Sequence, residues 1–238
     1  MNAMIDNRNM RVLILIAATT ALFGFTAGVP DLQQARDRQD RPLLDKLVGE
    51  FKGEADKQPN DAVAQYRLAL AESYAAEVAV EVKDKAQAKS YAEAGIAAAE
   101  KATQLKPSVA EYYRILGTLC GQMISSNGLA ALRYGNCAMS AVNKALELDP
   151  KSAANYLSHG VGYYYLPAAL GGGVDVAIKD FQKAIEIDPK SSEAHLWLGI
   201  ALRKQNKHAD AHKALEKALE LNPNRVWAKQ QLDKTPAQ

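Results

Sequence analysis

Three segments of the chain end alike, and they decide the fold: NKALELDP at 143–150, QKAIEIDP at 182–189 and EKALELNP at 216–223. Each places aliphatic residues at helical spacing after a Lys-Ala pair and closes on Asp-Pro or Asn-Pro. Proline cannot continue a helix, and it biases the residue before it away from helical geometry. Each segment therefore predicts a helix that ends just before its proline. A looser fourth copy, EKATQLKP, occupies 100–107.

The closing prolines recur at intervals that suit a repeat architecture. They stand at positions 107, 150, 189 and 223, so that successive steps are 43, 39 and 34 residues. Self-similarity with a period of about 20–50 residues is the signature of stacked structural repeats. The extra residues of the longer steps are expected in the turn between the two helices of a repeat, on one edge of the stack.

A second recurring feature lies upstream of each proline, where an aromatic residue or histidine precedes a glycine. The glycines are Gly117, Gly160 and Gly199. A glycine inside a helix costs about 1 kcal/mol relative to alanine, so a recurring one needs a packing reason. We expect each glycine to touch the second helix of its own hairpin. The small residues expected opposite them are Ala138, Ala177 and Ala211.

With these features the chain resembles the tetratricopeptide repeat (TPR) family. In the last copy, His195, Gly199, Ala211, Ala218 and Pro223 occupy positions of the 34-residue pattern. The resemblance implies an all-α fold, a right-handed α-solenoid of TPR helical hairpins. About four repeats would fill residues 60–225, with boundaries at 62–108, 110–151, 153–190 and 192–225. The first of them is degenerate.

Both ends of the repeat array are expected to carry capping helices, because a terminal repeat would otherwise expose an apolar face. At the N-terminal end, residues 30–59 are assigned to a cap, and 43–58 resemble a lone second helix with Leu47 and Phe51 in its apolar positions. At the other end, residues 226–238 are expected to form one more helix, which contains Trp227, and a loose tail.

The N-terminal segment has the form of an export signal. Arg8 and Arg11 precede an uncharged, mostly apolar run over residues 12–29, whose 18 residues approach the length that spans a bilayer. Residues 1–29 are therefore predicted to be a signal peptide or an uncleaved signal-anchor in the inner membrane. Either form places the repeat domain outside the cytoplasm, in the periplasm or facing it.

The TPR resemblance also implies a binding surface, because the first helix of each repeat lines the concave inner face. Aromatic and arginine side chains there suit an extended peptide or an anionic end group. The alternative for any one residue is packing between repeats. The residues that the pattern assigns to this face are Tyr66, Arg67, Tyr74, Arg114, Gln122, Tyr164, Tyr165, Trp197, Arg203 and Lys204.

Two local features complete the set of candidates. Cys120 and Cys137 are the two cysteines, and an exported domain would permit a disulfide between them, although two separate buried thiols fit the sequence equally well. The segment 166–175 carries Gly171 to Gly173 and predicts a tight turn with positive backbone angles. Asp175 is the expected N-cap of the next helix, and its charge argues against an anion site there.

The sequence contains little support for other functional classes. The formal net charge is +2, with 29 basic and 27 acidic residues, which does not favour a nucleic-acid partner. His208 and His212 share a helical face with Glu216, but no fourth metal ligand is evident. We find no catalytic or cofactor motif. The sequence thus predicts a non-enzymatic envelope scaffold for a protein or peptide partner, without cofactor or metal. The alternative is a small-ligand-binding periplasmic accessory of a TRAP-type transporter.

Overall fold

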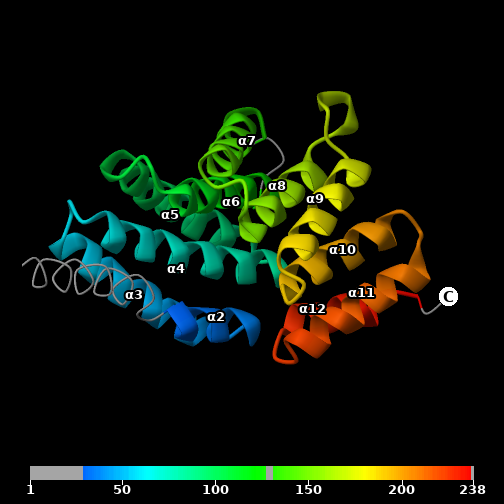
Figure 1. The fold of residues 1–238 in the computed structure, drawn as a ribbon. Coiled ribbons are helices and arrows are strands. Elements are labelled where there is room, and N and C mark those ends of the chain that lie inside the picture. The colour runs from blue at the N-terminus through cyan, green and yellow to red at the C-terminus, as the bar shows by residue number, and fades with distance from the viewer. Residues whose placement is uncertain (1–28, 127–130, 237–238) are drawn as a thin grey trace, which may run out of the picture.

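The protein is described here by a computed structural model, in which residues 29–126 and 131–236 are placed (Figure 1). These residues form α-helices and one short 3₁₀ helix, and no strand occurs among them. The predicted all-α fold is confirmed. Residues 1–28 of the predicted signal segment, 1–29, lie outside the described part, and its last residue, Val29, is the first residue of α2. The helices are α2 (Val29–Asp37), α3 (Arg41–Lys57), α4 (Ala62–Glu81), α5 (Lys85–Leu105), α6 (Ala110–Ser126), α7 (Ala131–Leu148), α8 (Ala153–Tyr165), η2 (Ala168–Leu170), α9 (Val174–Ile187), α10 (Ser192–Lys204), α11 (His208–Leu221) and α12 (Val226–Asp233).

Successive helices pair as antiparallel hairpins, α4 with α5, α6 with α7, α8 with α9 and α10 with α11, and the pairs stack in chain order (Figure 1). A short turn connects each proline-ended segment to the next hairpin. The Ser152 hydroxyl accepts a hydrogen bond from the backbone N–H of Asn155, and Ser191 does the same for Ala194. A serine at this position satisfies an N–H group that the first helical turn leaves free, so the sequence itself starts each new hairpin.

The recurring glycines touch the second helix of their hairpins, as predicted. An added Cβ would lie 2.6 Å from the nearest side-chain atom at Gly160 and at Gly199, and closer still at Gly117. The neighbours that leave no room are the large residues Phe181, Leu215 and Val142 respectively. The expected alanines play a smaller part. Ala138 and Ala211 contribute backbone oxygens to these contacts, and Ala177 is not among the nearest neighbours of Gly160.

The extra residues of the longer repeats are not all in turns, which corrects the prediction. In the repeat over 62–108 they lengthen the helices, so that α4 has 20 residues and α5 has 21, against 13 and 14 in α10 and α11. The reason is composition, because α4 and α5 are rich in alanine, the strongest helix former. In the repeat over 153–190 the insertion does lie in the turn, between α8 and α9.

That turn needs its three glycines. Gly171 and Gly173 have φ angles of +83° and +115°, which side-chain-bearing residues rarely adopt. A Cβ at Gly172 would collide with the backbone of Leu166. The predicted tight turn is therefore confirmed. The predicted N-cap is wrong, since Gly173 occupies that position and Asp175 lies within the first turn of α9, where it accepts a hydrogen bond from Gln205.

The ends of the array differ from expectation at one point. The helix expected over 43–58 is α3, but it is not alone, because α2 precedes it and packs on α3 and α4. α12 covers residues 226–233, the stretch predicted to start a further helix.

Between the ends, Cys120 of α6 and Cys137 of α7 are joined by a disulfide with 6.0 Å between their Cα atoms. No helix in the described part of the chain is both long and apolar enough to cross a membrane.

The stack curls until its two ends meet. α2 and α12 lie side by side in Figure 1, although nearly the whole described chain separates them. Asn222 donates a hydrogen bond of 2.7 Å to Asp37, and Gln230 donates one of 3.2 Å to Gln39. The helices therefore form a closed ring and not an open arc, which determines the geometry of the inner face.

Candidate functional site

The inner side of the ring encloses a cavity of about 940 Å³. Its walls come from α2, α4, α6, α7, α8, α10, the turn after α8 and Trp227 of α12, so residues from both ends of the array face the same space. The lining is mainly apolar and includes five aromatic side chains. They are Tyr74, Tyr163, Tyr165, Trp197 and Trp227. A largely apolar cavity of this size, with a few polar groups converging on it, is the usual form of a binding site.

Trp197 is the centre of the aromatic wall. Its ring centroid lies 5.3 Å from that of Trp227, 5.7 Å from Tyr164 and 6.2 Å from Tyr165, in edge-to-face arrangements, and it stacks on Phe181 at 6.2 Å. Such pairs add about 0.5–1.5 kcal/mol each beyond their area burial. The rings therefore pack together where α8, α9, α10 and α12 meet, while Tyr165, 49% exposed, remains accessible at the edge of the wall.

Five of the ten predicted concave-face residues line this cavity. They are Tyr74, Arg114, Gln122, Tyr165 and Trp197. Two of these are held by neighbours. Gln122 donates a 3.0 Å hydrogen bond to the backbone oxygen of Ser73, and Arg114 forms an ion pair with Glu111 on its own helix. The carbonyl oxygen of the Gln122 side chain has no hydrogen-bond partner among the described atoms.

Two of the other five predicted residues pack within the N-terminal half. Tyr66 is only 4% exposed, stacks on Tyr112 with ring centroids 5.1 Å apart, and donates a hydrogen bond to Glu111. Arg67 pairs with Glu54 at 2.9 Å and lies over the Phe51 ring. Both side chains join neighbouring helices, which is the packing alternative that the sequence left open.

The remaining three lie around the C-terminal end of the ring. Arg203 donates hydrogen bonds to the backbone oxygen of Gln231 at 2.9 Å and to its side chain at 2.7 Å, and so holds α12. Lys204 places its ammonium group 4.3 Å from the centroid of the Tyr164 ring. Tyr164 itself packs behind the aromatic wall and not in its lining.

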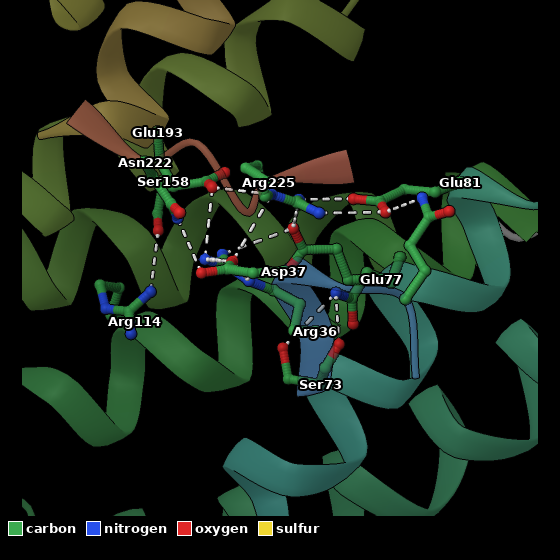
Figure 2. A network of polar contacts seen from close by, with 12 residues as sticks. Arg36, Asp37, Ser73, Glu77, Glu81, Arg114, Ser158, Glu193, Asn222 and Arg225 are labelled. Carbon is green, nitrogen blue, oxygen red and sulfur yellow. Dashed lines mark hydrogen bonds and ion pairs between the residues drawn. The ribbon is translucent and has the colours of Figure 1, made fainter. Parts of the chain in front are cut away.

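A buried group of charges closes the ring beside the cavity (Figure 2). We call it the closing cluster, and its members are Arg36, Asp37, Glu77, Glu81, Glu193 and Arg225. The side chain of Arg225 is 0% exposed. Its guanidinium lies 2.5 Å from Glu81, 2.6 Å from Glu77 and 2.9 Å from Glu193. One arginine from the turn before α12 thus contacts carboxylates of α4 and α10.

Arg36 is the second cation of the closing cluster. It lies 2.5 Å from Asp37, 3.3 Å from Glu193 and 3.7 Å from Glu77. It also lies 5.1 Å from the centroid of the Tyr74 ring. Buried ions are tolerated when opposite charges and hydrogen bonds surround them, and these contacts supply both.

Burial and the neighbouring charges act in opposite directions within the cluster. Burial raises the pKa of Glu81 to about 7, although Arg225 partly opposes it. Burial likewise raises the pKa of Glu77, against Arg36 and Arg225. For Glu193, burial acts in the same direction, but Arg225 and Arg36 together outweigh it and hold the pKa below its usual value. For both arginines the carboxylates outweigh burial and raise the pKa, so the guanidiniums stay charged.

Sequence reasoning did not find the closing cluster. Arg225 follows Asn222-Pro223-Asn224 in a turn between helices, a place where a charged residue is usually solvated. Its partners Glu77 and Glu81 lie 148 and 144 residues earlier. No pattern confined to one repeat contains that pairing, because it arises from how far the stack curls.

Within the described residues, no group of three or more His, Cys, Asp or Glu side chains could hold a metal ion. His159 is hydrogen-bonded to both Asp180 and Asn143, at 2.9 and 3.0 Å, and these contacts tie the hairpins around α8 together.

The stack of helical hairpins is that of a TPR-type repeat protein, and a tetratricopeptide repeat model matches residues 172–232. The TPR fold indicates a scaffold for protein–protein interaction. The chain belongs to the family described as regulator of microtubule dynamics protein 1-3, whose model matches residues 31–172. No protein with a curated description matches the chain in sequence.

One solved structure shows the same fold at low sequence identity, and others are similar with lower TM-scores. A thermophilic TPR protein of Thermus thermophilus superposes with a TM-score of 0.63 at 17% identity, covering 81% of this chain and 90% of that one. The first TPR domain of Spaghetti, bound to an HSP90 peptide, gives a TM-score of 0.42 at 22% identity, covering 52% and 90%. YrrB, described as a TPR protein with an unusual peptide-binding site, gives 0.42 at 19%, covering 87% and 96%.

Proposed function

We propose that this protein is a non-enzymatic scaffold that holds an apolar segment of a protein partner in the cavity of the ring. The observation that carries the proposal is the cavity itself, with about 940 Å³ of mainly apolar space and aromatic side chains from several helices. Aromatic anchors in a desolvated pocket dominate the affinity of protein interfaces. The TPR fold supports a protein partner over other classes of ligand.

A photocrosslinking residue at position 165 tests this proposal. Tyr165 lines the cavity and is half exposed, whereas Tyr156 lies on the same helix outside the lining and serves as the matched control. We expect crosslinks from position 165 that map to one short apolar segment of a partner, and none from position 156. Crosslinks that arise equally from both positions would contradict binding in the cavity.

Affinity measurements with the identified segment complete the test. The Tyr165→Ala variant should weaken binding by about tenfold or more, since truncating an aromatic anchor costs about 1–4 kcal/mol. The Tyr156→Ala variant should bind like the wild type. If native mass spectrometry instead finds a small apolar molecule in the cavity and no segment competes with it, the scaffold proposal fails. The TRAP-transporter role that the sequence raised has no support in the comparisons.

The family description provides a specific candidate partner. Its members are described as regulators of microtubule dynamics. We propose microtubules as a partner to be tested, by co-sedimentation of the purified chain with polymerised tubulin. Binding that Tyr165→Ala weakens would place the polymer, or a protein on it, at the cavity. Binding that the variant leaves unchanged would place it on another surface.

Microtubules lie in the cytoplasm, so a microtubule partner and export of the repeat domain exclude each other. As the location that competes with a microtubule partner, we propose an oxidising compartment outside the cytoplasm. The basic and apolar N-terminal segment and the bonded pair Cys120 and Cys137 support this location, because disulfides persist where thiols are oxidised. A fusion of an export-dependent reporter after residue 238 tests it. Reporter activity that requires residues 12–29 is the expected result, and activity without them would contradict export.

A further inference from the structure

Polar contacts join the two ends of the ring, whereas apolar packing holds the rest of the stack. One apolar core runs from Leu32 in α2 to Ala138 in α7, and two smaller ones lie within α8 to α12. Among the described residues, none of these cores joins α2 or α4 to α10 or α12. The two ends meet through the closing cluster and its neighbours instead. That junction is therefore held by charge and hydrogen bonds, which respond to pH far more than apolar contacts do.

The closing cluster holds two more carboxylates than guanidiniums. Its members come from α2, α4, α10 and the turn before α12, and no further lysine, arginine or histidine of the described chain forms an ion pair with it. The neutral groups that contact the cluster are Tyr74, Gln39, Asn222 and Trp227. With all four carboxylates ionised, the buried group would carry a surplus of negative charge, which burial strongly disfavours.

The same residues form a wall of the cavity. Arg36, Glu77, Glu81 and Glu193 are in its lining, together with Trp227 just beyond Arg225. If the junction parts, α2 and α4 move away from α12, and the cavity becomes a groove open along that side. An open groove admits a longer or bulkier segment than a closed ring does.

We propose that the closing cluster is a latch, which holds the ring shut around the cavity and releases it when the surplus carboxylates lose their protons. The latch regulates the binding site of the proposed function, and so it rests on that function. Closed and open rings are then two states of one protein, and proton uptake by the cluster shifts the population toward the closed state.

The direction of the pH response follows from the carboxylates. Glu81, with its side chain 2% exposed, has a pKa raised by burial from 4.5 to about 7, and the pKa of Glu77 is raised too. A proton on either group favours the closed state, so the contribution of Glu81 is full below about pH 4.5 and is lost as the pH rises through about 7. Glu193, whose pKa is lowered, acts oppositely and weakens closing only in stronger acid.

Distances between two spin labels, measured by pulsed electron paramagnetic resonance on the full chain, test the latch without any partner. Arg38 beside α2 and Lys229 in α12 are exposed positions on the two sides of the junction and suit substitution by cysteine. Cys120 and Cys137 are bonded to each other and do not take up label. We expect one short distance at about pH 5.5, and a longer distance whose population rises at least about threefold by about pH 8.5.

Two variants separate the latch from a general effect of pH. Glu81→Gln removes one surplus charge and should keep the short distance at both pH values. Glu93→Gln, on the exposed face of α5, is the matched control and should respond like the wild type. A distance distribution of the wild type that is the same at both pH values overturns the proposal, and so does a pH response that Glu81→Gln leaves intact.

If a variant does not fold, the comparison of the wild-type distance distributions at the two pH values is enough to test the latch. Because no partner is present, failure of the latch leaves binding in the cavity untouched. Conversely, failure of the crosslinking experiment at position 165 leaves the measured distances unaffected. The two proposals therefore fail by separate results.

Discussion

The guanidinium of Arg225 lies 2.5 Å from a carboxylate oxygen of Glu81, a residue 144 positions earlier in the chain. This one pair joins the turn before the last helix to the end of α4. Together with the contacts of Arg225 to Glu77 and Glu193 and of Asn222 to Asp37, it holds the two ends of the stack together as a ring around a cavity. The contact is also fully buried on the arginine side, so its loss has a large and measurable effect on stability.

Replacing Arg225 by methionine should destabilise the protein strongly. The change leaves Glu77, Glu81 and Glu193 without their main cation, and breaking a buried ion pair in this way costs about 3–5 kcal/mol, less whatever protonation recovers. Urea unfolding followed by helical circular dichroism measures the loss. Lys217→Met is the control, since Lys217 pairs with Glu220 on the surface and such pairs contribute about 0–1 kcal/mol. Equal losses in both variants would contradict a structural role for the Arg225 contacts.

Glu72 should make stability fall as the pH rises. Burial raises its pKa from 4.5 to about 7, Lys52 opposes the shift, and one carboxylate oxygen has no hydrogen-bond partner among the described atoms. The stability that the protonated form of Glu72 contributes is full below about pH 4.5 and is lost as the pH rises through about 7.

The Glu72→Gln variant tests that direction. At about pH 8 it should be more stable than the wild type by on the order of 1–3 kcal/mol, and the difference should shrink toward acid pH. Thermal unfolding across this range measures it. A stability difference that does not change with pH would show that Glu72 is not the group responsible.

Reduction of the disulfide should loosen the hairpin of α6 and α7. Cys120 and Cys137 are 17 residues apart, and a bridge over a loop of this size stabilises by about 2–4 kcal/mol. Intact mass after alkylation should show no modified cysteine without reductant and two with it. Two alkylated cysteines in the protein as isolated would exclude the bond.

Adding a methyl group at Gly199 should disrupt the last hairpin. A Cβ there would lie 2.6 Å from Leu215, so Gly199→Ala is expected to destabilise by about 1–3 kcal/mol despite the better helix propensity of alanine.

The control for Gly199 is Gly53 in α3, which has nothing within 4 Å of an added Cβ. Gly53→Ala should be neutral or stabilise by up to about 1 kcal/mol. Both variants are compared by thermal unfolding. If the two changes have the same sign and size, close packing of the hairpins does not explain the recurring glycines.

The hairpin fold could be predicted from the sequence because its signals are local. Prolines end helices, serines begin them, and glycines such as Gly117 and Gly199 mark where two neighbouring helices touch. Half of the predicted inner-face residues line the cavity for the same reason, since helical periodicity sets which way Tyr74 or Trp197 faces. Arg203 and Tyr66 do not line the cavity, because their side chains contact helices outside their own repeat.

Local patterns in the sequence are enough to predict the helices, their pairing into hairpins and the order of the stack, because each depends on residues within one repeat or its neighbour. The closure of the stack, in which Arg225 meets Glu77, Glu81 and Glu193 beside a cavity, is visible only in the folded protein. Small rotations between successive hairpins add up along the stack. Their sum determines whether its two ends meet, and no local pattern records it.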